Sequence, residues 1–446
     1  MFCAILNYKP TECLNQRIST NSDKLFDMKK IITILILLAT TGFYGHAQSD
    51  STATANKNSV QVGKLYMAPI PMVASNPAFG LVYGIAASGS MFLGDPSTTN
   101  MSNGMVTATY STKKQLMFTF KSNVYTKNND WFLIGDWRLF FSSQPTYGLG
   151  TGPQANLLVV DDDLGEFELG DYIDGVADAE LMDFNLIRFN QTALRQVKPN
   201  FYLGLGYHLD LFSKMDDHLL DLDTVPPRIT YHYAYSKKHG FDPEKYTTSG
   251  VSFNAIYDSR DNVANPYTGR YAMASFKVLP TFLGSDQNAT TLWLEYRDYF
   301  SVSKKTARNI IAVWTYFNLT TSGTLPYMAL PAVGWDQMGR SGRAYPQGRW
   351  RGNNLFYAEV EYRVGLPLVK KNPDLLGAVV FADVTSASFS SENPELDVNL
   401  FEYFKPAAGL GLRIMIQKKS RLNIGLDYAW GVDGASAFYL SLNESF

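Results

Sequence analysis

The sequence of 446 residues has almost no cysteine: two residues, Cys3 and Cys13, both close to its start. A framework of several disulfide bonds is therefore excluded. Charge is also sparse, because 18% of the residues are charged and the formal net charge is −2. Proteins that bind nucleic acid and disordered acidic chains both carry much more charge of one sign. We therefore expect no nucleic-acid partner.

Apolar runs that could form a membrane helix of about 20 residues are missing as well. The longest run lies in Met28–Gln48, where Lys29 and Lys30 precede a short apolar stretch, and Gly45 and Ala47 flank a cleavage point. These features are typical of a secretory signal peptide, so we predict that the protein is exported.

The expected domain boundaries follow from this segment. We predict a non-native or disordered extension at 1–27 with Met28 as the true start, a signal peptide at 28–47, a short polar leader at 48–61 and one domain at 62–446. The mature chain would then contain no cysteine, which also excludes a lipid-anchored N-terminal cysteine.

Aromatic residues, in contrast, are plentiful, with 27 tyrosines and 28 phenylalanines. An exported chain of this composition fits either a secreted β-sandwich or an outer-membrane β-barrel. Alternating polarity distinguishes the two folds. In Leu355–Leu366, apolar residues at even positions alternate with Glu359, Glu361 and Arg363. The same alternation recurs in three further segments: Phe201–Leu211, Leu292–Phe300 and Arg421–Trp430.

These alternating segments run for about ten residues, which is the length of a tilted strand that crosses a bilayer, whereas sandwich strands average about five or six residues. We therefore predict an all-β fold, a 16-stranded antiparallel transmembrane β-barrel with a polar lumen. The predicted strands are 62–73, 79–93, 104–113, 115–126, 131–143, 181–194, 200–213, 249–258, 269–280, 289–302, 307–320, 354–366, 375–388, 405–417, 420–430 and 436–446.

The connections between the predicted strands support this count. A bacterial barrel starts and ends on the periplasmic side, so its odd-numbered connections are extracellular and long. Four odd-numbered connections are indeed long excursions, at 144–180, 214–248, 321–353 and 389–404, whereas most even-numbered connections are short turns.

Several motifs of the C-terminal half resemble one family of barrels. They are YDSRDNVANPYTGRY at Tyr257–Tyr271, the loop MGRSGRAYPQGRWRGNN at 338–354, with Arg343, Ala344 and Tyr345, and the strand VFADVTSA at 380–387, with Phe381 and Asp383. The sequence from Tyr257 to the C-terminus resembles the outer-membrane assembly and translocation barrels, the BamA- and TamA-like superfamily that is also called the bacterial surface antigen family. Ala344 stands where that family usually has glycine.

The resemblance implies that the sixth extracellular loop folds back into the lumen and is held there by Arg343. A guanidinium in a barrel lumen is costly unless it is paired, and a carboxylate is its most economical partner. Asp383 has the right face and neighbourhood, and Glu359 and Glu361 are further candidates. Alternatively, all three arginines of Gly342–Gly352 are solvated on an extracellular loop.

The first predicted strand contains Pro69 and Pro71, whose missing N–H groups lie along one edge. If this strand meets the last one, Phe438–Phe446, their junction is short of hydrogen bonds. The resemblance implies a lateral gate at this seam, with Leu442 and Phe446 on its other side, where a client strand adds by β-augmentation. Alternatively, the prolines lead into a barrel that starts later. Phe446 also resembles the C-terminal signal by which barrels are recognised for insertion.

Other candidate sites are weak. The acidic run Val159–Asp171 lacks the ligand spacing of a calcium loop, and His218, His232 and His239 lack a metal-ligand spacing, so we expect surface loops and no metal. No nucleophile elbow or phosphate-binding loop is present, and we expect neither enzymatic activity nor a cofactor. A serine–histidine pair formed across two strands stays an open alternative.

The resemblance implies a monomeric barrel in the bacterial outer membrane that helps to insert or translocate polypeptides, or that perturbs lipid. Its expected partners are outer-membrane lipid and either unfolded outer-membrane proteins or a periplasmic protein. The polar leader is too short for the polypeptide-transport-associated (POTRA) domains that precede the barrels of this family. Two other functions stay open: a gated or passive pore for small solutes, and a membrane anchor for a separate periplasmic partner.

Overall fold

The computed structural model describes residues 61–76, 80–153, 180–224, 228–303, 306, 308–390, 397–418 and 420–446. The predicted extension, the signal peptide and nearly all of the leader lie outside the described residues, as does the acidic run Val159–Asp171. All the described residues belong to one compact unit, Val60–Phe446.

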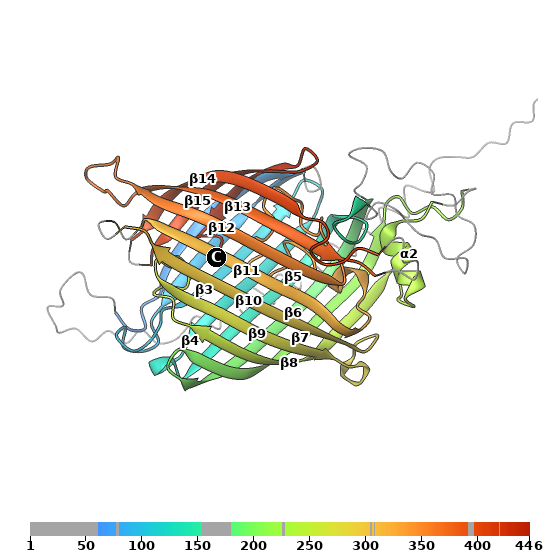
Figure 1. The fold of residues 1–446 in the computed structure, drawn as a ribbon, viewed down its shortest axis with the longest axis horizontal. Coiled ribbons are helices and arrows are strands. Elements are labelled where there is room, and N and C mark those ends of the chain that lie inside the picture. The colour runs from blue at the N-terminus through green and yellow to red at the C-terminus, as the bar shows by residue number, and fades with distance from the viewer. Residues whose placement is uncertain are drawn as a thin grey trace, which may run out of the picture. The chain divides into compact units, whose positions relative to one another are not determined.

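Sixteen strands form one sheet in which each strand pairs with the next along the chain. The strands are β1 (Tyr66–Asn76), β2 (Gly80–Met91), β3 (Ser102–Ser111), β4 (Leu116–Tyr125), β5 (Trp131–Thr146), β6 (Glu180–Lys198), β7 (Phe201–Asp217), β8 (Lys245–Asp258), β9 (Gly269–Leu279), β10 (Ala289–Ser301), β11 (Ile310–Gly323), β12 (Asn354–Leu366), β13 (Leu376–Ser388), β14 (Lys405–Gln417), β15 (Leu422–Gly431) and β16 (Ser436–Leu442). They slant around a common axis as a barrel (Figure 1). The predicted all-β fold of sixteen antiparallel strands is confirmed.

The two faces of β12 differ as the alternation predicts. In β12, Tyr357, Glu359 and Glu361 are at most 2% exposed, whereas Val360 and Tyr362 are 46% and 43% exposed. The buried face lines the lumen, and the exposed apolar face forms the outer surface that meets lipid. The core of this protein is therefore the packed interior of the barrel.

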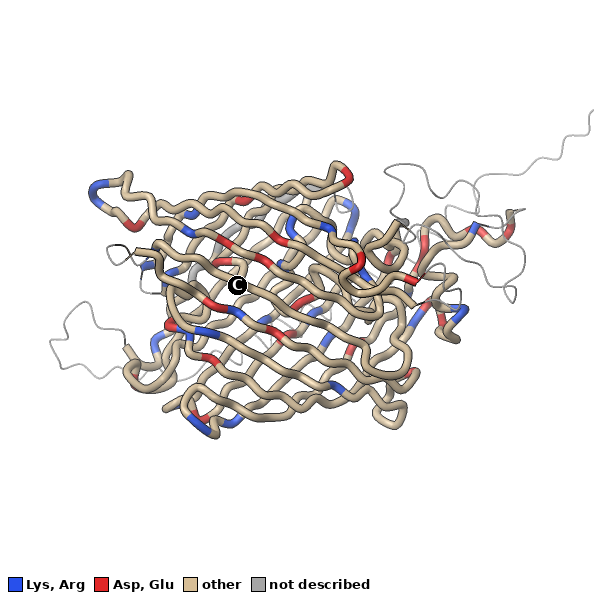
Figure 2. Tube along the Cα trace, in the orientation of Figure 1, with Lys and Arg blue, Asp and Glu red and all other residues tan. Residues whose placement is uncertain are grey.

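Charges in the lumen are paired along single strands. Side chains two positions apart on a strand share one face, so an acid and an arginine at that spacing meet. Such pairs are Asp136–Arg138, Glu295–Arg297 and Glu361–Arg363, and Asp258 at the end of β8 pairs in the same way with Arg260 just beyond the strand. Figure 2 shows acidic and basic positions close together along the strands of the wall. This pairing offsets much of the cost of removing these charges from water.

The long connections join β5 to β6, β7 to β8, β11 to β12 and β13 to β14, as predicted. The connection from β7 to β8 contains a short helix that the sequence did not predict, α2 (Tyr231–Lys238). Thr230 caps it, because its side chain accepts a hydrogen bond from the backbone N–H of Tyr233. No helix among the described residues is long and apolar enough to span a membrane.

The last strand differs from the prediction. It was expected at 436–446, but β16 ends at Leu442. Asn443 has a φ of 65°, a left-handed conformation that breaks the extended chain. The residues that follow, Glu444 and Phe446, are 4% and 3% exposed, so the chain turns into the lumen instead of continuing along the wall.

Candidate functional site: a loop locked in the lumen

The connection between β11 and β12 folds into the barrel. Its tip residues Ser341, Arg343 and Tyr345 are 5%, 4% and 6% exposed. The hydroxyl of Ser341 donates to Asp336, and the backbone N–H groups of Gly339 and Ser341 donate to the same carboxylate. Asp336 therefore organises the tip from within the loop and satisfies donors that the lumen would otherwise leave unpaired.

Arg343 lies among three carboxylates of the wall. Its Nη2 donates to Glu359 and Glu361 of β12, and its Nη1 lies 3.3 Å from Asp427 of β15. The guanidinium also stacks 3.4 Å from the centre of the Phe381 ring. A single cation thus contacts strands β12, β13 and β15, and it neutralises part of a buried acidic cluster.

The assignment of Asp383 as the first partner of Arg343 was wrong. Both carboxylate oxygens of Asp383 are buried and have no hydrogen-bond partner among the described residues. Asp383 pairs in register with Glu359, one strand away from the guanidinium's partners. The guanidinium of Arg343 lies over the Phe381 ring and donates instead to Glu359 and Glu361 of β12 and to Asp427 of β15.

The two residues after Arg343 fix the direction of the loop. Ala344 has a φ of 83°, a region that glycine adopts readily and that strains alanine. Its N–H donates to the hydroxyl of Tyr439 on β16. The hydroxyl of Tyr345 donates to the carbonyl of Pro406 at 2.6 Å and accepts from the N–H of Val432 at 3.0 Å. The tip is therefore attached to β14, β16 and the connection between β15 and β16.

The alternative of three solvated arginines was wrong, because Arg343 and Arg351 are buried and Arg349 is half-buried. Arg351 is fully buried, donates to the carbonyl of Tyr327 at 2.8 Å and lies over the Tyr327 ring. Arg349 is half-buried and lies 4.2 Å from the centre of the Trp350 ring. Arg343 binds carboxylates of the wall, whereas Arg349 and Arg351 lie over aromatic rings of the loop and its neighbours.

A fourth arginine of the loop, Arg340, was not predicted to have a role. Arg340 donates to the backbone carbonyls of Leu442 and Glu444, where β16 ends. A hydrogen bond to a backbone carbonyl needs no particular residue type in the partner, so no pattern of charges in the sequence points to it. Arg340 connects the sixth loop directly to the C-terminal end of the chain.

The charged cluster also continues to the C-terminus. Glu361 pairs with Arg363 at 2.6 Å, and Glu444 accepts from Arg413 at 2.7 Å, while Arg413 also binds Asp427. Because Arg343 binds Glu361 and Asp427, the loop and the C-terminal tail belong to one network of buried ion pairs.

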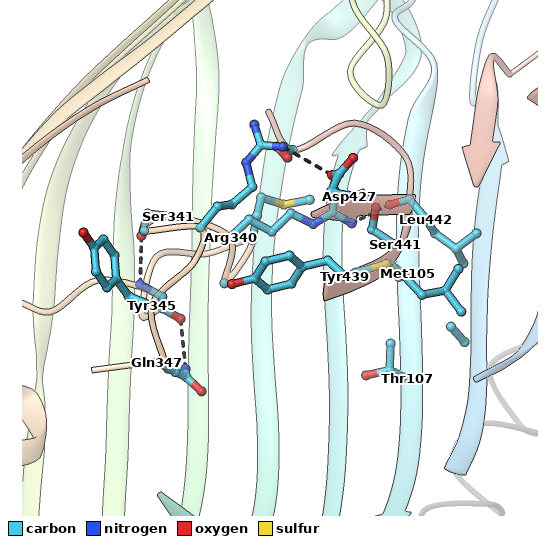
Figure 3. Close-up of a pocket in the computed structure, with 18 of the residues that line it drawn as sticks. Met105, Thr107, Arg340, Ser341, Tyr345, Gln347, Asp427, Tyr439, Ser441 and Leu442 are labelled. Atoms are coloured by element: carbon cyan, nitrogen blue, oxygen red, sulfur yellow. Dashed lines mark hydrogen bonds and ion pairs between the residues drawn. The ribbon is translucent and has the colours of Figure 1, made fainter. Parts of the chain in front are cut away.

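A cavity of about 300 Å³ lies beside this network (Figure 3). It is lined by Arg340 and Tyr345 of the loop, Tyr439 and Leu442 of β16, and Met105 of β3. The loop tip and the strands near both ends of the sheet therefore face one common space.

The two ends of the sheet are β1 and β16, and some of their Cα atoms lie within 8 Å. Within the described ranges, no hydrogen-bonded ladder joins these strands. Pro69 and Pro71 lie inside β1 and face Ala87 and Ile85 of β2 in register. The barrel therefore starts with these prolines and not after them.

The apolar residues near the C-terminus do not all lie on the outer face. Phe438 and Leu440 are 65% and 36% exposed, but Leu442 and Phe446 are 7% and 3% exposed. The turn at Asn443 places the terminal phenylalanine inside the barrel.

The loop histidines and the open serine–histidine alternative are also located. His232 is fully buried, contrary to the expected surface position, and its Nδ1 lies 2.8 Å from Asp217. His208 of β7 lies 2.7 Å from the hydroxyl of Ser252 on β8. Ser252 is itself fully buried, so this pair presents no nucleophile to a substrate in this conformation.

Residues 188–446, more than half of the chain, match the Omp85 superfamily domain. The chain belongs to the Omp85 superfamily. This Omp85 protein is accordingly a barrel of the bacterial outer membrane, as predicted.

Three solved structures resemble this chain to different degrees. BamA from Haemophilus ducreyi lacking POTRA domains 1–3 is 14% identical, with a TM-score of 0.52 over 85% of this chain and 70% of that chain. CdiB from Acinetobacter baumannii and CdiB from Escherichia coli are each 10% identical, with TM-scores of 0.46 and 0.45 over 85% of this chain and 59% and 60% of those chains. No curated protein matches this sequence.

Proposed function

We propose that this Omp85 barrel assists the insertion or translocation of polypeptides in the outer membrane, at the seam between β1 and β16. The observation that carries the proposal is the arrangement of this seam: the two strands at the ends of the sheet approach one another, and no ladder joins them in the described residues. An unpaired strand edge accepts an additional strand by β-augmentation.

The composition of the two strands supports a weak seam. Pro69 and Pro71 lack backbone N–H groups, so β1 offers fewer donors than an ordinary edge strand. β16 has seven residues, whereas β12 has thirteen, so its edge is also short. A client strand that pairs with either edge would gain hydrogen bonds that the two strands do not provide for each other.

The sixth loop serves as an internal brace in this proposal. Arg343 holds the loop tip on the wall, and Arg340 holds the end of β16 on the loop. Opening of the seam by movement of β16 therefore requires that the contacts of Arg340 break or that the loop moves with the strand. The brace thus sets the free-energy cost of opening.

A passive pore for solutes is a less favoured function, because the loop occupies the lumen and its tip is nearly fully buried. An anchoring role for a separate periplasmic protein has no specific contact to support it among the described residues.

Depletion of the protein followed by a quantitative census of the outer membrane tests the proposal. We expect that particular barrels decrease while total lipid and its distribution between leaflets stay unchanged. A change in lipid asymmetry with normal levels of all barrels would instead assign a lipid-handling role. No change in either quantity would contradict the proposal.

A further inference from the structure

A second cavity, of about 220 Å³, lies in the lumen on the side of strands β5 to β11. Lumen-facing residues of these strands form its wall side, and the part of the sixth loop between Leu325 and Gln337 forms its other side. The residues on the wall side are mostly polar or charged. The cavity is therefore suited to a polar ligand held between the wall and the loop.

The cavity reaches into the extracellular half of the lumen. Lys277 lies two residues before the end of β9, and Thr248 and Trp293 lie near the starts of β8 and β10. The connections at these strand ends, from β7 to β8 and from β9 to β10, are odd-numbered and therefore extracellular. The nearest source of a ligand is thus the cell exterior.

The carboxylates at the cavity already have partners. Three of them are bound by an arginine, in the pairs Asp210–Arg188, Glu295–Arg297 and Asp136–Arg138. A fourth, Asp336, accepts from the hydroxyl of Ser341 and from N–H groups of its own loop. These contacts satisfy the acids, so the cavity does not require a cation from outside.

Lys277 of β9 differs from these paired charges. Its side chain is half-buried and lines the cavity, and within the described ranges it makes no hydrogen bond or ion pair. Its neighbours in register, Ser252 of β8 and Thr291 of β10, are uncharged. Asp210, an acid at the same cavity, is bound by Arg188 through both of its oxygens. A partly desolvated ammonium without a partner is stabilised by an anion.

Three neutral donors at the cavity are buried and have no partner in the described part of the chain. Two belong to the loop, Nε1 of Trp335 and Nε2 of Gln337. The third is on His208, whose Nε2 lies 2.7 Å from the hydroxyl of Ser252, to which Asn254 also donates. The hydroxyl hydrogen is therefore available to Nε2, which places the ring hydrogen on the unpartnered Nδ1.

One unpartnered acceptor completes this set, Oδ1 of Asn190 on β6. A phosphate group meets the combination, because its oxygens point in four directions and its hydroxyl donates when it carries a proton. An ionised carboxylate has two oxygens in one plane and no hydrogen to donate. Donors on both sides of the cavity, a free ammonium and one acceptor therefore favour phosphate over a carboxylate.

We propose that this cavity binds phosphate, either as the free anion or as the phosphate group of a larger molecule. Lys277 and His208 bind it from the wall. Trp335 and Gln337 bind it from the sixth loop, so the ligand joins the loop to β7 and β9. Bound phosphate thus holds the loop in the lumen by contacts separate from those of Arg343, and this site is independent of insertion at the seam.

Calorimetric titration of the folded full-length barrel in detergent with inorganic phosphate tests the site. We expect saturable binding, and Lys277→Gln should weaken it at least about tenfold because the charge is lost. Lys277→Arg keeps the charge and should bind within about threefold of the wild-type protein. Lys121→Gln is the matched control with unchanged affinity, since Lys121 is another buried lumenal lysine, donates to the carbonyl of Met338 and does not line the cavity.

Trp335→Phe tests the loop side of the site. It removes the Nε1–H and keeps an aromatic ring, so we expect phosphate to bind about fivefold more weakly. This variant also tests the site if Lys277→Gln does not fold, which gel mobility without heating shows.

Two further ligands identify the source of the phosphate. Tighter binding of inorganic phosphate than of glycerol 1-phosphate would assign the free anion, and the reverse order would assign the phosphate group of a larger molecule. Succinate offers carboxylates in place of phosphate. Three results would each overturn the proposal: no saturable binding up to about 10 mM phosphate, equal affinity of the wild-type protein and a folded Lys277→Gln or Trp335→Phe variant, or tighter binding of succinate.

Discussion

At the scale of single residues, the lumen is organised by arginines whose partners differ in kind. Arg343 binds carboxylates of the wall, Arg340 binds backbone carbonyls of the C-terminal tail, and Arg351 binds backbone carbonyls of its own loop. A buried cation with its partners is stable, but removal of one member leaves the others desolvated and unpaired. Each contact therefore predicts a different result of mutation.

Neutralisation of Arg343 tests its partner assignment. We expect Arg343→Gln to destabilise the folded barrel by about 3 kcal/mol, since it leaves Glu359, Glu361 and Asp427 without their shared cation. Addition of Glu359→Gln should recover part of this loss, whereas addition of Asp383→Asn should not, because Asp383 makes no hydrogen bond to Arg343. The midpoint of urea unfolding, followed by gel mobility without heating, measures both. If adding Asp383→Asn restored stability and adding Glu359→Gln did not, the assignment would be contradicted.

Ala344 supplies a second test at this scale. Its φ of 83° strains any residue with a Cβ. Ala344→Gly removes about 1 kcal/mol of this backbone strain but also removes the contacts of the methyl group. We expect unchanged or higher stability. Ala429→Gly, at a buried position in β15, should instead lower the stability by about 1 kcal/mol. Comparable losses in both variants would show that the loop tip does not adopt this conformation.

At the scale of elements, sequence patterns predicted the strands well because the period of two is a local property. The bounds of β12 agree with the predicted 354–366, and its buried and exposed faces agree with the alternation. The end of β16 could not be predicted in this way, because Phe446 continues the apolar pattern while the chain turns at Asn443. Likewise, the choice of Glu359 over Asp383 depends on where Arg343 lies, which alternation does not determine.

The exposed face of a central strand gives a test of the lipid contact. Leu410 lies in the middle of β14 and is 53% exposed. We expect Leu410→Arg to destabilise the barrel in liposomes by about 2–4 kcal/mol, since it places a charge at the depth of the hydrocarbon. Ser436→Arg, at the first residue of β16, should cost less than about 1 kcal/mol. Equal tolerance of both changes would contradict a membrane-spanning wall.

At the scale of the whole molecule, the barrel combines a closed lumen with an incompletely paired seam. Sequence patterns predicted the number of strands and the long connections. The family resemblance predicted that the sixth loop enters the lumen. The sequence did not predict that the C-terminal tail shares the charged network of that loop, because Glu444 and Arg413 are 31 positions apart and their contact depends on the turn at Asn443. The network is thus a property of the folded barrel.

Conductance in planar bilayers tests whether the loop closes the lumen. We expect the wild-type barrel to give small and flickering currents, and a variant with residues 332–350 replaced by a short glycine–serine linker to give larger and more stable steps. The physical reason is that the loop tip is nearly fully buried inside the barrel. Large, stable steps from the wild-type protein would instead favour a solute pore.

The most direct test of the proposed insertion at the seam is a reversible disulfide across it. Two double-cysteine variants join Met67 of β1 to β16, one with Phe438→Cys and one with Leu440→Cys. All three side chains are exposed on the outer face. A control disulfide joins Val360→Cys and Ala382→Cys, which already face each other in β12 and β13.

The measurement is the folding rate of a client barrel into liposomes that contain each protein. We predict that oxidation of the seam pair abolishes the acceleration of client folding, that reduction restores it, and that the control disulfide has no effect. Equal acceleration by the oxidised and reduced forms of a fully crosslinked seam would contradict the account.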